Sequence, residues 1–327
     1  MKQHHISHRF SLFAGLLSLL IFGATLTAAL ALSGMIIEFP IPTAGSEPVG
    51  ITAGPDGNLW FTESHGNNIG RITTKGVVTE FPVPTAFSGP GGIAAGPDGN
   101  LWFTEEFGNQ IGRITTKGVV TEFPIPTAGS LLFGIAAGPD DNLWFTEEFG
   151  NQIGRITTAG VVTEFPIPTA SSLPFGIAAG PDGNLWFAEF IGNNIGRITT
   201  AGVVTEFPVP RASSGPVGIT AGPEGNLWFT EEVGNNIGRI TTAGVVTEFP
   251  VPTANSEPLG ITAGPDDKLW FTEAAGDKIG RISPTPKHKL TEFPVPTANS
   301  QPELIAAGPE GKLWFTEAVG NQIGQLR

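Results

Sequence analysis

A pattern of apolar and polar positions recurs along almost the whole chain with a period of about 42 residues. Its clearest mark is the phrase Leu-Trp-Phe-Thr-Glu, which in one copy reads Leu-Trp-Phe-Ala-Glu. The seven tryptophans stand at positions 60, 102, 144, 186, 228, 270 and 314, so five of the spacings are 42 residues and the last is 44. A fixed period of this length indicates a repeat architecture in which each unit packs against its neighbours.

Each unit of the pattern predicts four short β-strands joined by turns. In the first unit the predicted strands are Gly50–Ala53, Leu59–Thr62, Ile69–Thr73 and Val77–Val83. Asp-Gly and Lys-Gly pairs between them supply the positive φ that tight hairpins need. The fourth strand ends in Phe-Pro-x-Pro, and because proline cannot donate to a strand ladder, we expect this strand at the outer edge. Four strands in about 42 residues are typical of one blade of a β-propeller.

The two ends of the repeat region predict how the ring closes. The chain ends in the third strand of the last unit, at 323–327, and the missing fourth strand is found near the start, at 36–42. The N-terminal strand therefore completes the last blade. We expect an all-β fold, a seven-bladed β-propeller of residues 33–327 with four-stranded blades.

Residues 1–32 precede the repeats and have the features of an export signal. A basic start at 2–9 is followed by an apolar run at 10–26 and by Ala-Leu-Ala at 29–31, which is typical of a cleavage site. The alternative is an uncleaved membrane anchor, because the apolar run is nearly long enough to span a bilayer. We expect a secreted or extracytoplasmic protein, with membrane contact only if this segment is retained.

Composition narrows the chemistry further. The chain contains no cysteine, which excludes disulfides, thiolate nucleophiles and cysteine-based metal sites. Its net charge of −13 repels phosphate backbones and argues against nucleic acid as a partner. A cationic or neutral ligand, or a metal ion, suits an acidic surface better.

The repeat resembles that of a known family. The phrase GI(T/A)AGPDGNLWFTE, followed by GN(N/Q)IGRIT and by VTEFP(V/I)PT, is closely similar to the repeat of the virginiamycin B lyase family over essentially the whole repeat region. That resemblance implies a Mg²⁺-dependent carbon–oxygen lyase that linearises streptogramin B antibiotics by elimination. It also implies working residues in the pattern Glu-Pro-His-Gly-Ile, followed by the glutamate of Leu-Trp-Phe-Thr-Glu, and a substrate-contacting histidine in the preceding blade.

The chain departs from the family at the histidine positions. The residues there are Val49, Gly91, Phe133, Phe175, Val217, Leu259 and Glu303. None is histidine, and the upstream glutamate of the pattern is matched only by Glu47 and Glu257. Aligned end to end, the catalytic blade of the family corresponds to the last one here. The resemblance then implies Glu303 as the base and Leu259 and Gln301 at substrate-contacting positions.

The strand glutamates are candidate metal ligands. Each Leu-Trp-Phe-Thr-Glu unit ends a strand at what we expect to be the same mouth of the ring, and we expect residue 49 to lie opposite residue 63 across the first hairpin. Carboxylates gathered there could hold a hard cation such as Mg²⁺ or Ca²⁺. The candidates are Glu47, Glu63, Glu257, Glu273 and Glu317. The alternative is that each strand glutamate accepts hydrogen bonds from a neighbouring loop and only supports its blade.

Two functions therefore stand side by side. The first is a propeller that binds a small molecule, a glycan or a protein at its mouth without catalysis. The second is a metal-dependent lyase acting on streptogramin B-type cyclic depsipeptides or a related ester, with Glu303 as the base in place of histidine. We favour the first, because the catalytic histidine is replaced in all seven units.

Overall fold

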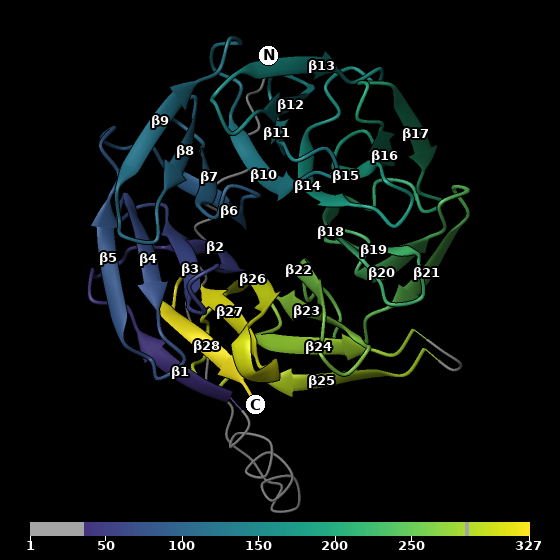
Figure 1. Ribbon diagram of the computed structural model, residues 1–327. Coiled ribbons are helices and arrows are strands. Elements are labelled where there is room, and N and C mark those ends of the chain that lie inside the picture. The colour runs from purple at the N-terminus through teal and green to yellow at the C-terminus, as the bar shows by residue number, and fades with distance from the viewer. Residues whose placement is uncertain (1–35, 285–287) are drawn as a thin grey trace, which may run out of the picture.

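The computed structural model describes residues 36–284 and 288–327 of the chain. Within them, seven four-stranded antiparallel sheets stand around a common axis like the blades of a propeller (Figure 1). The predicted all-β, seven-bladed fold is confirmed. No helix among the described residues is long and apolar enough to cross a membrane. The expected export signal, residues 1–32, lies outside the described part of the chain.

Each blade is built from strands that follow one another along the chain. Blade 1 consists of β2 (Pro48–Ala53), β3 (Leu59–Glu63), β4 (Asn68–Ile72) and β5 (Val78–Pro82). Blades 2 to 6 repeat this order as β6 (Pro90–Ala95), β7 (Leu101–Glu105), β8 (Gln110–Ile114), β9 (Val120–Pro124); β10 (Leu132–Ala137), β11 (Leu143–Glu147), β12 (Gln152–Ile156), β13 (Val162–Pro166); β14 (Pro174–Ala179), β15 (Leu185–Glu189), β16 (Asn194–Ile198), β17 (Val204–Pro208); β18 (Pro216–Ala221), β19 (Leu227–Glu231), β20 (Asn236–Ile240), β21 (Val246–Pro250); and β22 (Pro258–Ala263), β23 (Leu269–Glu273), β24 (Lys278–Ile282), β25 (Leu290–Pro294).

Blade 7 is assembled from both ends of the chain. Its strands are β26 (Pro302–Ala307), β27 (Leu313–Glu317), β28 (Gln322–Leu326) and β1 (Ile36–Pro40), with the 3-10 turn η1 (Pro309–Gly311) between the first two. Strand β1 pairs with β28 in antiparallel register, from Ile36 opposite Leu326 to Pro40 opposite Gln322. The N-terminal strand thus supplies the missing outer strand, as the sequence predicts, and the ring is closed by a complete four-stranded sheet.

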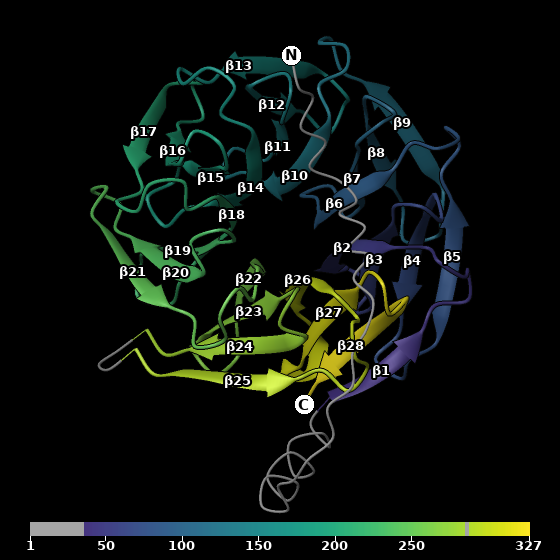
Figure 2. The same ribbon diagram turned by 180° about the vertical axis from the view of Figure 1, so that it is seen from behind.

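The first strand of every blade lies innermost and the fourth lies on the outer rim, as both views show (Figures 1 and 2). Between neighbouring blades the tryptophans form the core. Trp60 is fully buried and stacks on Phe81 of its own blade with ring centroids 5.5 Å apart. Its other neighbours include Ile93 and Phe103 of blade 2, so each blade buries its apolar face against the next.

A threonine hydroxyl joins each blade directly to its neighbour. The Oγ1 atom of Thr62 accepts a hydrogen bond from the amide of Gly50 at 2.8 Å and donates one to the carbonyl oxygen of Gly91 in blade 2 at 2.6 Å. A β-carbon on Gly50 would come within 2.5 Å of that same oxygen, so glycine allows the closest approach at this junction. The same bridge is made by Thr104, Thr146, Thr230, Thr272 and Thr316. Blade 4 carries Ala188 at this position and lacks the hydroxyl.

One fully buried glutamate closes the second strand of each blade. In blade 1 the Oε2 atom of Glu63 accepts from the side-chain amide of Asn68 at 3.4 Å, and the loop folds over it so tightly that a β-carbon on Gly66 would lie 2.8 Å away. Burial, and secondly the nearby carboxylate of Glu80, raise the pKa of Glu63 to about 7. The equivalent glutamates are also fully buried, and burial raises their pKa values to about 7 or 8: Glu105, Glu147, Glu189, Glu231, Glu273 and Glu317.

Because blade 4 lacks the threonine hydroxyl, adding it should raise the free energy of unfolding. We expect Ala188→Thr to stabilise the protein by about 1 kcal/mol, the usual net gain from one intramolecular hydrogen bond. Thr230→Ala, which deletes the bridge at the next junction, should destabilise it by at least as much, because it leaves a buried carbonyl oxygen without a donor. Thermal unfolding of both variants and the unmodified protein checks this. A lower melting temperature for Ala188→Thr would contradict it.

The buried glutamates predict that stability declines as the pH rises. A carboxyl whose pKa is higher in the folded state than in the unfolded chain holds its proton more tightly when folded. Its stabilising contribution is present below the unfolded value and is lost as the pH passes through the folded value. With folded pKa values of about 7 or 8, we expect the melting temperature to fall by at least about 3 °C between pH 5 and pH 9. Calorimetry in a buffer series measures this, and a melting temperature that rises over that range would refute it.

Candidate functional site

The site lies at the mouth of the central channel, on the face where first strands begin and second strands end. Each first strand contains a register shift close to its start, between Pro48 and Ile51 in blade 1. The shift places Pro48, and not Val49, opposite Glu63, so the expected pairing of residues 49 and 63 is wrong by one position. The residues that follow the proline position form what we call the mouth ring: Val49, Gly91, Phe133, Phe175, Val217, Leu259 and Glu303.

The backbone of the mouth ring is held by the threonine bridges. Each ring carbonyl, except that of Val217, accepts the hydroxyl of the preceding blade; for Glu303 the donor is Thr272, at 2.5 Å. The side chains are not part of this linkage. The place of a mouth-ring residue therefore depends on its backbone and not on the type of its side chain. One member can be a glutamate while others are apolar.

Glu303 is the ionisable member of the mouth ring, and its carboxyl is partly shielded from solvent. Burial raises its pKa to about 8, and three further carboxylates act in the same direction, those of Glu47, Glu232 and Glu257. These come from three different blades or the loops before them. The predicted base therefore does lie at the mouth, within electrostatic reach of two of the residues predicted as metal ligands.

Six glutamates form an acidic collar around the mouth: Glu47, Glu106, Glu148, Glu232, Glu257 and Glu303. Burial, and secondly the charge of Glu47, raise the pKa of Glu106 to about 7. Burial and the charge of Glu106 raise the pKa of Glu148 to about 8, and Glu148 is only 6% exposed. The Oε2 atom of Glu47 lies 2.6 Å from Nδ1 of His65. The collar is thus a continuous chain of interacting carboxyls.

Three members of the collar were missed by reasoning from the sequence. Glu106, Glu148 and Glu232 directly follow the strand glutamate, in units that read Leu-Trp-Phe-Thr-Glu-Glu. The other four units have Ser64, Phe190, Ala274 and Ala318 at this position. The difference between units was visible in the sequence, but the position belongs to a loop, so its direction toward the mouth emerges only from the closed ring.

An aromatic wall faces the collar from blades 3 and 4. Phe133 and Phe175 meet edge to face with ring centroids 5.1 Å apart, and Phe190 packs on Phe175 at 5.6 Å. Strands β10 and β14, which carry the first two, lie across the channel from β26 and β2 (Figure 1). The mouth therefore combines carboxyls from most of the ring with aromatic rings from blades 3 and 4.

The strand glutamates do not gather at the mouth. Glu63, Glu273 and Glu317 are fully buried inside their own blades, where their charged neighbours are outer-strand carboxylates such as Glu80. The acidic groups that raise the pKa of Glu317, after burial, are Glu38 and Asp277, so the structure does not bring it together with Glu303. The alternative interpretation, in which each strand glutamate supports a loop, describes what is seen. The expected crowding around one mouth is wrong.

No group of three or more histidine, aspartate or glutamate side chains is arranged to hold a metal ion within residues 36–284 and 288–327. The residues implied as ligands by the resemblance therefore do not fit a Mg²⁺ ion as they stand. Glu47 and Glu257 face the mouth, whereas Glu63 and Glu273 are enclosed beneath it. The binding of Mg²⁺ stays a prediction, and the described residues include no group of side chains placed to coordinate the ion.

The two predicted substrate-contacting residues occupy different surroundings. Leu259 is a half-buried member of the mouth ring, and its carbonyl oxygen accepts from Thr230 at 2.6 Å. Gln301 is exposed, has a positive φ of 55° and precedes β26 in the loop that leads to Glu303. Both border the acidic collar, so their assignment as contact residues stays open to test.

Comparison with known proteins covers the whole repeat region. The model of the Virginiamycin B lyase family matches residues 23–172 and 135–327. A solved streptogramin B lyase is 40% identical over 89% of this chain and 97% of its own, with a TM-score of 0.85. Virginiamycin B lyase from Staphylococcus aureus is 42% identical over 89% of this chain and 98% of its own, also with a TM-score of 0.85.

Two further solved structures are similar to this chain. A catalytically inactive histidine-to-alanine variant of the S. aureus enzyme, solved with quinupristin, gives the same identity, coverage and TM-score. Hydrazine synthase from Kuenenia stuttgartiensis, 18% identical over 88% of this chain and 97% of its own with a TM-score of 0.73, shares the fold alone. Because the family model and the solved enzymes both extend over the seven repeats, this chain belongs to the virginiamycin B lyase family.

Proposed function

We propose that this protein is an extracytoplasmic binding module that holds a small cationic ligand at the mouth of its propeller. The observation that carries the proposal is Glu303, a glutamate at the family's histidine position, surrounded by the carboxyls of Glu47, Glu232 and Glu257. The family's histidine, which abstracts a proton, is thereby replaced by a glutamate that belongs to a row of interacting carboxyls. Such an arrangement favours charge recognition over proton transfer.

Electrostatics supports a cation as the ligand. Carboxyls that are buried together hold protons above their usual range, since ionising all of them would place like charges side by side. A bound cation offsets that repulsion and lets more of them ionise. Phe133, which packs edge to face on the buried Phe175, adds a ring on which a cation packs favourably through its negative face.

Binding without catalysis has a parallel within the family. The S. aureus variant that has lost one histidine is described as catalytically inactive and yet was solved with quinupristin. A propeller of this family that lacks a histidine can therefore keep a ligand. The present chain has no histidine at any of the seven corresponding positions.

A carbon–oxygen lyase is the second candidate, and one observation favours it. Burial raises the pKa of Glu303 to about 8, which brings this carboxyl closer to the range in which a general base works at neutral pH. As a base, its carboxylate would take the proton next to a carbonyl of the substrate while the ester carbon–oxygen bond breaks. The implied metal ligands do not converge within the part of the chain that the structure describes.

The binding proposal predicts charge-dependent affinity. We expect a quaternary ammonium probe, phenyltrimethylammonium, to bind in calorimetry, and Glu303→Gln to weaken its affinity about tenfold, equivalent to about 1.4 kcal/mol. Binding near pH 7.5 should release protons, because the cation lowers the pKa values of Glu303, Glu106 and Glu148 from about 7 or 8. Repeating the titration in buffers of different ionisation enthalpy measures that release.

A matched control comes from the opposite face. Asp267→Asn removes one negative charge from the turn between β22 and β23, which is exposed and far from the mouth. This variant should bind the probe as the unmodified protein does. Equal loss in both variants would mean that only net charge matters, and absence of binding would remove the proposal.

The two candidate functions are separated by a product assay. We expect the unmodified protein, incubated with a streptogramin B with and without Mg²⁺, to leave the antibiotic cyclic by mass spectrometry. The S. aureus enzyme serves as the positive control. A linear product that disappears in Glu303→Gln would favour the lyase, with Glu303 as its base. The double variant Gln301→Glu/Glu303→His installs the glutamate and the histidine of the family pattern, with Leu304 still in place of its glycine, and tests whether those two positions alone restore turnover.

A further inference from the structure

We propose that the central channel directly beneath the mouth takes an aliphatic chain attached to the cation, and that Leu304 sets how long this chain can be. The inference rests on the proposed binding of a cation at the collar. It adds a second subsite, of opposite chemistry, and names the residue that limits it.

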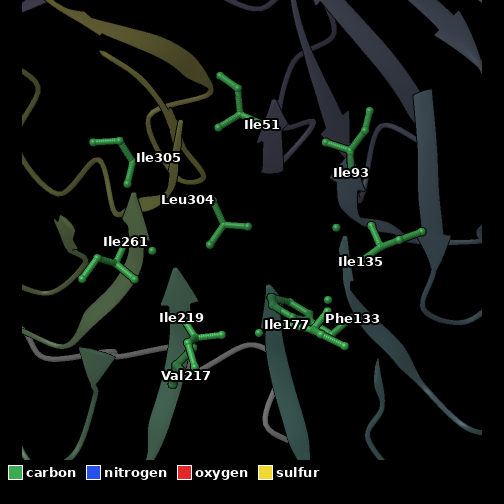
Figure 3. Close-up of a pocket in the computed structure, with 15 residues that line it drawn as sticks. Ile51, Ile93, Phe133, Ile135, Ile177, Val217, Ile219, Ile261, Leu304 and Ile305 are labelled. Atoms are coloured by element: carbon green, nitrogen blue, oxygen red, sulfur yellow. The ribbon is translucent and has the colours of Figure 1, made fainter. Parts of the chain in front are cut away.

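The channel beneath the mouth is a cavity with apolar side chains. Seven isoleucines line it, one from each first strand, from Ile51 in blade 1 to Ile305 in blade 7 (Figure 3). Its volume is about 140 Å³, and its wall also includes Phe133 and Val217 of the mouth ring. Every lining residue has an apolar side chain or is glycine, so the polar part of the wall comes from the backbone. The isoleucine side chains give this open channel an apolar wall against which a hydrocarbon chain can be buried.

Leu304 interrupts the pattern of this lining. The residue before the channel isoleucine is glycine in the other six blades, as in Gly50 and Gly218, and is leucine only in blade 7. Figure 3 shows the Leu304 side chain standing inside the ring of isoleucines. The amide of Leu304 lies 3.1 Å from Oγ1 of Thr316, compared with 2.8 Å for the same bond of Gly50, so the bridge is kept. The leucine therefore takes up channel space without breaking the blade.

The two subsites are continuous. Glu303 of the collar directly precedes Leu304 of the channel, and Phe133 and Val217 belong both to the mouth ring and to the cavity wall. A cation seated against the collar thus has the channel opening next to it. A hydroxylated substituent would leave polar groups unpaired between the isoleucines, which is unfavourable. A plain alkyl chain meets no such cost and gains from removal of its surface from water.

The occupant is therefore an alkyl ammonium ion, the cation on the collar and the chain in the channel. Each methylene that becomes buried should strengthen binding about fourfold. The gain should stop when the chain reaches Leu304. A longer chain would then have to leave the channel or displace the leucine, so the affinity should level off with increasing length.

A homologous series of n-alkyltrimethylammonium ions, from ethyl to octyl, tests this by calorimetry on the unmodified protein. We expect affinity to rise with length and then to become constant. In Leu304→Gly, which installs the residue of the other six blades, the constant region should begin about four methylenes later, matching the four carbon atoms removed. In Leu304→Phe it should begin earlier. Val319→Ala, at an exposed loop position, is the control and should leave the length dependence unchanged.

The outcomes separate this inference from the proposal on which it rests. If no member of the series binds, the cation proposal itself fails. If all members bind with equal affinity, or if the limit stays in place in both Leu304 variants, the collar remains and the channel subsite is refuted. Thermal unfolding of each variant confirms that the ring is intact before the comparison is made.

Discussion

The hydrogen bonds of a threonine hydroxyl at six of the seven blade junctions decide how this molecule is organised. Thr62 accepts from its own blade and donates to a carbonyl of the next, at the point where a glycine lets the two backbones approach. That carbonyl belongs to a residue of the mouth ring. The scaffold therefore fixes the position of a mouth-ring residue by a hydrogen bond to its backbone. The side chain of that residue takes no part in the bond. Valine, glycine, phenylalanine, leucine and glutamate all occupy equivalent places on that account.

This separation explains how a family fold is kept while its chemistry changes. The tryptophan core and the buried glutamates repeat in every blade and hold the blades together. The mouth, by contrast, differs from blade to blade: carboxyls around Glu303, aromatic rings around Phe175, and a leucine at 304 that reaches into the channel. Family membership thus accounts for the scaffold, and the individual residues of the mouth account for the binding that we propose.

The fold was predictable from the sequence because its determinants are local and repeated. The period, the edge-strand prolines and the strand missing from one end and present at the other were sufficient for the seven blades. The site was less predictable. The sequence predicts which strands pair in the first hairpin. It does not predict the bulge after Pro48, which shifts the register of that hairpin by one residue. Glu63 points into its own blade because Gly66 leaves room there. Glu148 and Glu303 lie far apart in the sequence, so their shared mouth exists only once the ring is closed.

The closure of blade 7 also has a kinetic side. Ile36 pairs with Leu326, so the first strand to leave the ribosome finds its partner in the last. Each other blade is a local meander that can form as soon as its own residues are available. The ring can be completed only when both β1 and β28 are available, and their pairing closes a loop that contains all the other strands. Until then, β28 presents an unpaired edge to any strand nearby. The same joint that makes the folded ring continuous is thus the step at which the chain is most exposed to association with its own copies.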